Sequence, residues 1–140
     1  VERFTETGLP SAGVVSMPNR ELSKYGVVDL EGELVKSIVE KPVPSDAPSS
    51  YVLCGRYLLP ENTAELLELV PESEYGELQS IALFEHMIKY GGFEGVKLEG
   101  CKLYDSGDPV IWLKSQIDHA LRREDVSEEL LSWLRERMAS

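Results

Sequence analysis

The chain has 140 residues, of which 42% are hydrophobic and 28% are charged, and its formal net charge is −11 at pH 7. This composition is typical of one globular domain with its own core, and it excludes disordered, collagen-like and mucin-like chains. Because the acidic excess repels polyanions, we expect no nucleic acid and no anionic membrane surface among the partners.

The sequence carries no sign of membrane insertion or secretion. No apolar run reaches the roughly 18 residues that cross a bilayer, and the opening VERFTETG lacks the basic and apolar regions of a secretory leader. Two isolated cysteines, Cys54 and Cys101, are typical of reduced, buried small hydrophobes. We therefore expect a cytoplasmic protein. The chain opens at Val1 in what reads as the end of a helix, which is typical of a fragment.

The first part of the chain is predicted to be a helix end followed by three strands. Residues 1–7 have helical character, and Gly8 followed by Pro10 is a typical helix stop. Short apolar runs rich in β-branched residues then predict strands over residues 12–17, 25–30 and 34–39. The turn over residues 31–33 favours a hairpin of the last two strands, and Pro42 ends the second of them.

A proline-rich loop and a long strand follow. Residues 42–50 contain three prolines and three serines, so they predict a surface loop. Residues 51–59 are nearly all apolar, which favours a strand covered on both faces. Gly55 within this strand indicates a bulge or a close backbone approach.

The remainder of the chain alternates between helices and strands. After Pro60 the apolar spacing predicts a helix that Asn62 or Thr63 caps. Apolar periodicity and glycine stops then predict a helix over 78–88, strands over 93–98 and 101–104, and helices over 110–121 and 126–138. Strands followed by this alternation predict an α/β fold with a mixed sheet.

Two helix starts near the C-terminus carry cap signatures. Asp108 stands before Pro109, which suits the first position of a helix, so Asp108 is predicted to be the N-cap. Asp125 with Glu128 three residues later predicts an acidic variant of the capping box for the last helix.

The common phosphate and metal motifs are missing from the sequence. It contains neither GxxxxGK[ST] nor a GxGxxG that opens a helix, and neither HExxH nor a Cys/His set with zinc spacing. The two histidines, His86 and His119, fall in helix-like segments without partners, so they are interpreted as structural.

Glu40-Lys41-Pro42 stands at the end of a predicted strand, where ligands of α/β sheets bind. A carboxylate can accept hydrogen bonds from sugar hydroxyls, and a lysine is a point charge suited to a phosphate. An exposed, ion-paired strand end is the alternative for these residues, because charged strand ends are ordinary.

Tyr104-Asp105-Ser106-Gly107-Asp108 places a second carboxylate at a predicted strand end. Asp105 could hold Mg²⁺, which prefers one or two protein carboxylates together with substrate phosphates and waters. Composition alone equally allows Asp105 to be a turn former.

Six motifs occur in order along the chain, and they are Ser23-Lys24-Tyr25-Gly26-Val27-Val28-Asp29, Ile38-Val39-Glu40-Lys41-Pro42, Ala47-Pro48-Ser49, Gly55-Arg56-Tyr57-Leu58-Leu59, Gly76-Glu77-Leu78-Gln79 and Asp105-Ser106-Gly107. Together they resemble the UTP-glucose-1-phosphate uridylyltransferases of the bacterial sugar nucleotidyltransferase type. The resemblance covers nearly the whole chain. It implies a mixed-sheet nucleotide-diphospho-sugar transferase (Rossmann-like) fold, of which this chain is the C-terminal portion.

The resemblance implies nucleotidyl transfer as the activity. An oxygen of glucose-1-phosphate would attack the α-phosphorus of UTP, pyrophosphate would leave, and Mg²⁺ would neutralise the accumulating charge. Lys41 and Asp105 are the implied catalytic residues: Lys41 would hold the phosphate of glucose-1-phosphate, and Asp105 would be one of two Mg²⁺ carboxylates.

The resemblance also implies a sugar pocket. Tyr25 and Gly26 would line it, and Glu40 would accept hydrogen bonds from sugar hydroxyls. The backbone near Leu53 and Gly55 would touch the sugar ring.

The implied organisation has two parts. Residues 1–109 would be the sugar-binding half of a nucleotidyltransferase domain, and residues 110–140 would be C-terminal helices. By resemblance these helices contact another subunit, so a homo-oligomer, a dimer or a tetramer, is expected.

The sequence departs from the family pattern in two ways. Nothing corresponds to the Gly-rich signature of the nucleotide half, and Ser80-Ile81-Ala82 stands where the family usually has Leu-Thr-Asp. A non-catalytic truncated module that binds a sugar phosphate or a partner subunit is therefore the first alternative. A thymidylyl- or cytidylyltransferase relative is the second.

Overall fold

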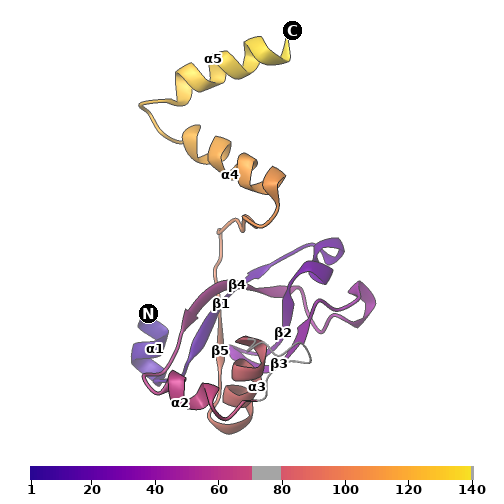
Figure 1. Cartoon of the computed structure of the whole chain (residues 1–140), viewed down its shortest axis with the longest axis vertical. Helices are drawn as coiled ribbons and strands as arrows, with labels where there is room; N and C mark the ends of the chain where they lie inside the picture. Colours follow the sequence, from indigo (N-terminus) through magenta and orange to yellow (C-terminus); the bar gives the residue numbers. More distant parts are fainter. Residues whose placement is uncertain (71–79, 140) are drawn as a thin grey trace. The chain divides into compact units, whose positions relative to one another are not determined.

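The structure is a computed structural model that describes residues 1–70 and 80–139. Its contacts divide the chain into two compact units, Val1–Cys101 and Lys102–Ser140 (Figure 1). In the first unit the elements are α1 (Glu2–Thr7), β1 (Ser11–Ser16), the 3₁₀ helix η1 (Asn19–Lys24), β2 (Gly26–Glu31), β3 (Leu34–Glu40), the 3₁₀ helix η2 (Pro44–Asp46), β4 (Tyr51–Leu58), α2 (Thr63–Leu67), α3 (Ser80–Tyr90) and β5 (Glu94–Lys97). The second unit contains α4 (Pro109–Ala120) and α5 (Ser127–Met138).

The described strands close into a barrel in the order β1-β4-β2-β3-β5. β1 is antiparallel to β4 and parallel to β5, while β2 and β3 form the predicted antiparallel hairpin. Two single pairings complete the ring, Val27 with Val52 between β2 and β4, and Leu34 with Glu94 between β3 and β5. The prediction of a mixed sheet is therefore confirmed.

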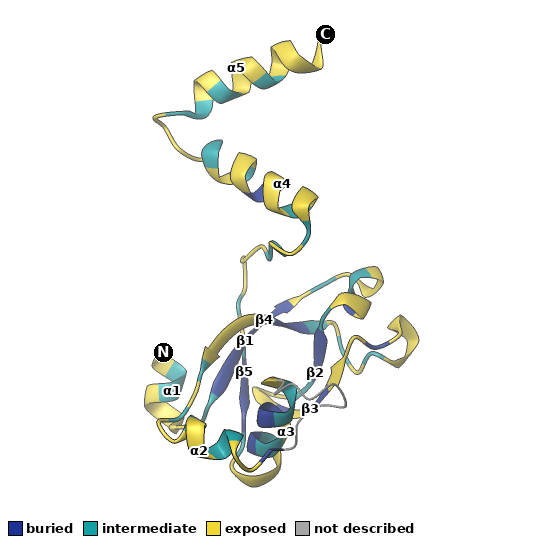
Figure 2. Ribbon diagram, in the orientation of Figure 1, coloured by how far each residue is buried: buried dark blue, intermediate teal, exposed yellow. Residues whose placement is uncertain are grey.

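The core lies between the strands and α3. Leu83, Phe84 and Met87 are buried on one face of this helix because their spacing of one, three and four residues places them on one side. The ring of Phe84 stacks on that of Phe93, with 4.9 Å between the centroids. Figure 2 shows the buried residues gathered on the strands and on this face of α3. The hairpin is thus held against a packed layer, which fixes the position of its ends.

The prediction that β4 is covered on both faces is wrong. Val52 and Leu53 are buried, but residues 55–57 are exposed. The pairing with β1 shifts in register between Ala12 and Val14, opposite this stretch of β4, and Gly55 has a φ of +69°. The bulge that Gly55 predicts is therefore confirmed, and the exposed residues of β4 are those beside it.

The strand predicted over residues 101–104 is also wrong. The side chains of Lys102 and Tyr104 both contact Asp118 of α4, so this segment follows the helix instead of pairing with a strand. The two compact units meet after Cys101, whereas the sequence-based division into a sugar-binding half and C-terminal helices is placed after residue 109 and stays a prediction.

The predicted helix caps have different outcomes. The Asp108 cap is confirmed, because its Oδ1 accepts hydrogen bonds from the backbone N–H groups of Val110 and Ile111. The capping box of Asp125 is wrong, because Asp125 binds the guanidinium of Arg123 and no side chain caps α5. Asn62 is the N-cap residue of α2, as predicted, but its side chain makes no capping hydrogen bond. In the described part of the chain no helix is long and apolar enough to cross a bilayer.

Candidate functional site

A cavity of about 470 Å³ opens at the end of the hairpin where β2 begins and β3 ends. It is lined by Lys24, Tyr25, Gly26, Glu40, Lys41, Leu53, Tyr57, Ser80 and Ile81, and we call it the hairpin-end pocket. Its volume is in the range of cavities that hold small ligands. One part of the lining is charged and the other is apolar or aromatic, as expected for a ligand with both polar and apolar faces.

The centre of the hairpin-end pocket is the pair of Gly26 and Glu40, which face each other across the hairpin. A Cβ atom on Gly26 would lie 3.0 Å from Oε2 of Glu40, 3.3 Å from Cδ1 of Leu53 and 3.4 Å from Cδ1 of Ile81. Three side chains from three elements therefore converge on this glycine. Because Gly26 has no side chain, the Glu40 carboxylate can turn toward the cavity.

Lys41 follows Glu40 in an unusual backbone conformation. Its φ is +48°, and among the described residues it is the only non-glycine with a positive φ. Its backbone N–H donates to the carbonyl oxygen of Tyr25 over 3.0 Å, which holds the turn in place. In an extended strand the side chains of residues 40 and 41 would point to opposite sides, whereas this turn brings both to one cavity. The Lys41 ammonium lies 3.7 Å from Oε1 of Glu40.

Four lining residues were not among the predicted site residues. Lys24 belongs to the first of the six motifs but has no implied role. It forms an ion pair with Glu21 at 2.7 Å, which lowers the pKa of Glu21. Tyr57 comes from the exposed end of β4, and its pKa is raised by burial and by nearby Cys54 and Glu40. Ser80 and Ile81 are brought in by α3, and only their departure from the family pattern could have drawn attention to them.

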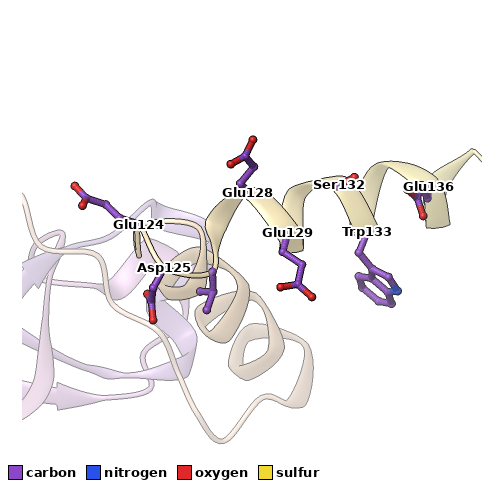
Figure 3. Close-up of a pocket in the computed structure, with 8 residues that line it drawn as sticks. Glu124, Asp125, Glu128, Glu129, Ser132, Trp133 and Glu136 are labelled. Atoms are coloured by element: carbon purple, nitrogen blue, oxygen red, sulfur yellow. The ribbon is translucent and has the colours of Figure 1, made fainter.

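A larger cavity, of about 590 Å³, lies along α5 and the turn before it (Figure 3). Glu124, Asp125, Glu128, Glu129 and Glu136 line it together with Trp133 and two other residues, and no lysine or arginine does. This lining repels phosphates. None of the predicted site residues lies there, so the hairpin-end pocket is the candidate site.

The family model for nucleotidyl transferases matches residues 1–105. The chain belongs to the nucleotidyl transferase family. Its sequence is 31% identical over 140 residues to the UTP--glucose-1-phosphate uridylyltransferase of Streptococcus pneumoniae, with 96% of this chain and 46% of that protein covered. It is also 31% identical over 143 residues to the enzyme of the same name from Haemophilus influenzae, with 96% and 48% covered.

Solved structures agree with this nucleotidyl transferase assignment. A UDP-glucose pyrophosphorylase from Acinetobacter baumannii superposes with a TM-score of 0.83 at 25% identity, over 96% of this chain and 48% of that chain. A UTP-bound structure from the same organism superposes with a TM-score of 0.85 over the same shares. The mixed α/β nucleotidyltransferase fold is therefore shown. The chain spans about half the length of the relatives it matches.

Seven catalytic and substrate-binding residues are predicted from the sequence. Five of them line the hairpin-end pocket: Tyr25, Gly26, Glu40, Lys41 and Leu53. Gly55 does not line it, because the bulge of β4 leaves this residue in open surroundings. Asp105 belongs to the second unit. The predicted motif over residues 76–79 lies outside the described residues.

Asp105 supplies one hard oxygen donor group in a fixed orientation. Its Oδ1 accepts a hydrogen bond from the backbone N–H of Gly107 at 2.9 Å. Residues 1–70 and 80–139 contain no group of three or more His, Cys, Asp or Glu side chains that could enclose a metal. A single carboxylate fits Mg²⁺ only when substrate phosphates and waters complete the coordination.

The two histidines pack against aromatic rings. The ring of His86 lies 4.7 Å from that of Tyr90, and the ring of His119 lies 6.0 Å from that of Tyr104. Neither lines the hairpin-end pocket. These contacts agree with the structural interpretation of both residues.

Proposed function

We propose that the chain is the C-terminal, sugar-phosphate-binding half of a cytoplasmic uridylyltransferase that forms UDP-glucose and pyrophosphate from UTP and glucose-1-phosphate. The observation that carries this proposal is the convergence of Tyr25, Gly26, Glu40, Lys41 and Leu53 on one cavity. These residues come from separate parts of the sequence. Relatives named as uridylyltransferases match 96% of the chain, which supports the same activity.

The lining of the hairpin-end pocket suits a hexose phosphate. The Glu40 carboxylate accepts hydrogen bonds from sugar hydroxyls, and the Lys41 ammonium attracts the phosphate. Leu53 and Ile81 offer apolar surface to the C–H face of the sugar ring. Both charged side chains are partly exposed, at 44% for Glu40 and 64% for Lys41, so a ligand can reach them.

Lys41 and Asp105 serve the reaction in different ways. Lys41 orients the phosphate of the sugar so that its oxygen can approach the α-phosphorus of the nucleotide. Asp105 is the residue of this chain that would hold Mg²⁺, and substrate phosphates and waters would complete the coordination. When bound, the ion neutralises charge on the phosphates.

The test is pyrophosphate release by the protein that carries this chain, supplied with UTP, glucose-1-phosphate and Mg²⁺. Release is expected, and Asp105→Asn is expected to lower kcat/KM by about 100-fold or more, because loss of a charged group that stabilises the transition state has effects of this size. Near-normal activity of Asp105→Asn would contradict the metal assignment. If the chain binds glucose-1-phosphate in calorimetry but the protein releases no pyrophosphate, it is a non-catalytic sugar-phosphate module.

We further propose that the protein is a homo-oligomer, a dimer or a tetramer. The second unit carries large apolar side chains on its surface, with Val110, Trp112 and Leu113 each about half exposed on α4 and Trp133 likewise on α5. Covering such residues favours association. Analytical ultracentrifugation is expected to show a dimer or tetramer, and Trp112→Glu is expected to shift the equilibrium toward the monomer. A monomer at every concentration would contradict the proposal.

A further inference from the structure

The carboxylate of Asp118, in the last turns of α4, holds two residues of the segment that leads to Asp105. The hydroxyl of Tyr104 donates to Oδ2 of Asp118 at 2.5 Å, and Nζ of Lys102 donates to the same oxygen at 2.5 Å. The Lys102 ammonium also lies 4.7 Å from the centroid of the Tyr104 ring. The hydrogen bonds from Lys102 and Tyr104 both lower the pKa of Asp118, which is therefore ionised at neutral pH.

The other end of this segment is attached to the start of the same helix. Oδ1 of Asp108 accepts hydrogen bonds from the N–H groups of Val110 at 2.9 Å and Ile111 at 3.0 Å. The N–H of Asp108 donates to the carbonyl oxygen of Asp105 at 3.2 Å, and the N–H of Gly107 donates to Oδ1 of Asp105 at 2.9 Å. Asp105 therefore lies in a loop with both ends on α4.

The loop between these two attachments is short. Positions 108 and 118 are ten residues apart, which corresponds to about 15 Å along a helix. Only four peptide steps join Tyr104 to Asp108, and the hydrogen bond from the N–H of Asp108 to the carbonyl oxygen of Asp105 makes them a turn. The side chains of Tyr104 and Asp118 bridge the remaining distance, so the hydrogen bond between them fixes the end of the loop that precedes Asp105. Release of the Asp118 end would allow Asp105 many more orientations.

We propose that Asp118 is a positioning residue, which fixes the Asp105 carboxylate for a divalent cation by holding Tyr104 and Lys102 on α4. The inference rests on the metal role proposed for Asp105. Exposed ion pairs contribute little to global stability. The role of Asp118 is therefore expected in the order of the loop and in cation affinity, with little effect on the melting temperature.

The first measurement needs no metal. Amide hydrogen exchange of Gly107 reports on its hydrogen bond to Asp105. In the 140-residue chain, Asp118→Ala is expected to speed this exchange, and Tyr104→Phe is expected to speed it less, because Lys102 still binds Asp118. Asp125→Ala is the matched control, since Asp125 binds Arg123 at 2.5 Å in the same unit without contacting the loop. It is expected to leave the exchange of Gly107 unchanged.

The second measurement is a Mn²⁺ titration with pyrophosphate present, because a single carboxylate holds a divalent cation only together with phosphate oxygens and waters. Binding is followed by line broadening at the amides of Asp105 and Gly107. In the wild-type chain the amide signals of these residues are expected to broaden. Asp118→Ala is expected to need about tenfold more Mn²⁺ for the same broadening, as is typical when a partner that orients a metal ligand is lost. Asp118→Glu is expected to restore part of the affinity, and Asp125→Ala to match the wild type.

The possible outcomes separate the two proposals. If Asp118→Ala matches the wild type in both measurements while Asp105→Asn abolishes the broadening, Asp118 has no positioning role and the metal role of Asp105 stands. If Asp105→Asn leaves the broadening unchanged, Asp105 does not bind the cation, and the inference about Asp118 fails with it.

Discussion

Replacing Lys41 by asparagine is expected to weaken the binding of glucose-1-phosphate to the chain by about 10- to 100-fold. A hydrogen bond to a charged group contributes about 1.5–3 kcal/mol, and each 1.4 kcal/mol corresponds to a tenfold change in affinity. Asparagine is the suitable replacement because Lys41 has a φ of +48°, a conformation that asparagine tolerates. The variant therefore removes the ammonium without adding backbone strain. Isothermal titration calorimetry measures the change.

Lys36 provides the matched control for this experiment. It lies on the same strand β3, is 51% exposed and forms an ion pair with Glu31 at the opposite end of the hairpin. Lys36→Asn removes the same charge and should leave the affinity unchanged. An equal loss of affinity in both variants would show that Lys41 acts through net charge alone. Unchanged binding of Lys41→Asn would remove Lys41 from the site.

Replacing Gly26 by alanine is expected to lower the affinity for glucose-1-phosphate about tenfold or more with little effect on stability. The new Cβ would lie 3.0 Å from Oε2 of Glu40, closer than about nine in ten real Cβ contacts, so the carboxylate must shift by a few tenths of an ångström. Leu53 and Ile81, at 3.3 and 3.4 Å, crowd the same methyl group from the apolar side. The φ of Gly26 is not positive, so the backbone itself accepts alanine. Calorimetry and urea unfolding measure the two effects separately.

Gly32, in the turn at the other end of the same hairpin, should respond in the opposite way. Its φ is +65° and no atom lies within 4 Å of its Cβ position. Gly32→Ala is therefore expected to cost about 1 kcal/mol in the free energy of unfolding and nothing in ligand affinity. If Gly26→Ala keeps full affinity, or if Gly32→Ala loses as much affinity as Gly26→Ala, the hairpin-end pocket is not the sugar site.

The sequence predicts the hairpin and its charged end because both depend on local signals. Alternation of β-branched residues and the turn over residues 31–33 define β2 and β3, and Pro42 marks the end. These signals also place Glu40 near Gly26, since a hairpin with a short turn has only a few registers. The positive φ of Lys41 could not be predicted, because lysine rarely adopts that conformation.

The parts that escaped prediction depend on contacts between distant residues. Tyr57 reaches the pocket because β4 bulges at Gly55, and Ile81 reaches it because α3 packs on the sheet. The apolar composition of residues 51–59 could not reveal that burial is confined to the first half of the strand. Likewise, residues 101–104 have strand-like composition, yet Asp118 holds Lys102 and Tyr104 beside a helix. Such long-range pairings leave no local pattern in the sequence.

The central claim is that the hairpin-end pocket binds the sugar phosphate, and amide chemical-shift mapping tests it most directly. The isotope-labelled 140-residue chain is titrated with glucose-1-phosphate, and inorganic phosphate serves as the control ligand. We expect saturable shifts at Tyr25, Gly26, Glu40, Lys41 and Leu53 that are larger with the sugar phosphate and that disappear in Lys41→Asn. Shifts confined to other residues, or no saturable shifts at all, would contradict the account.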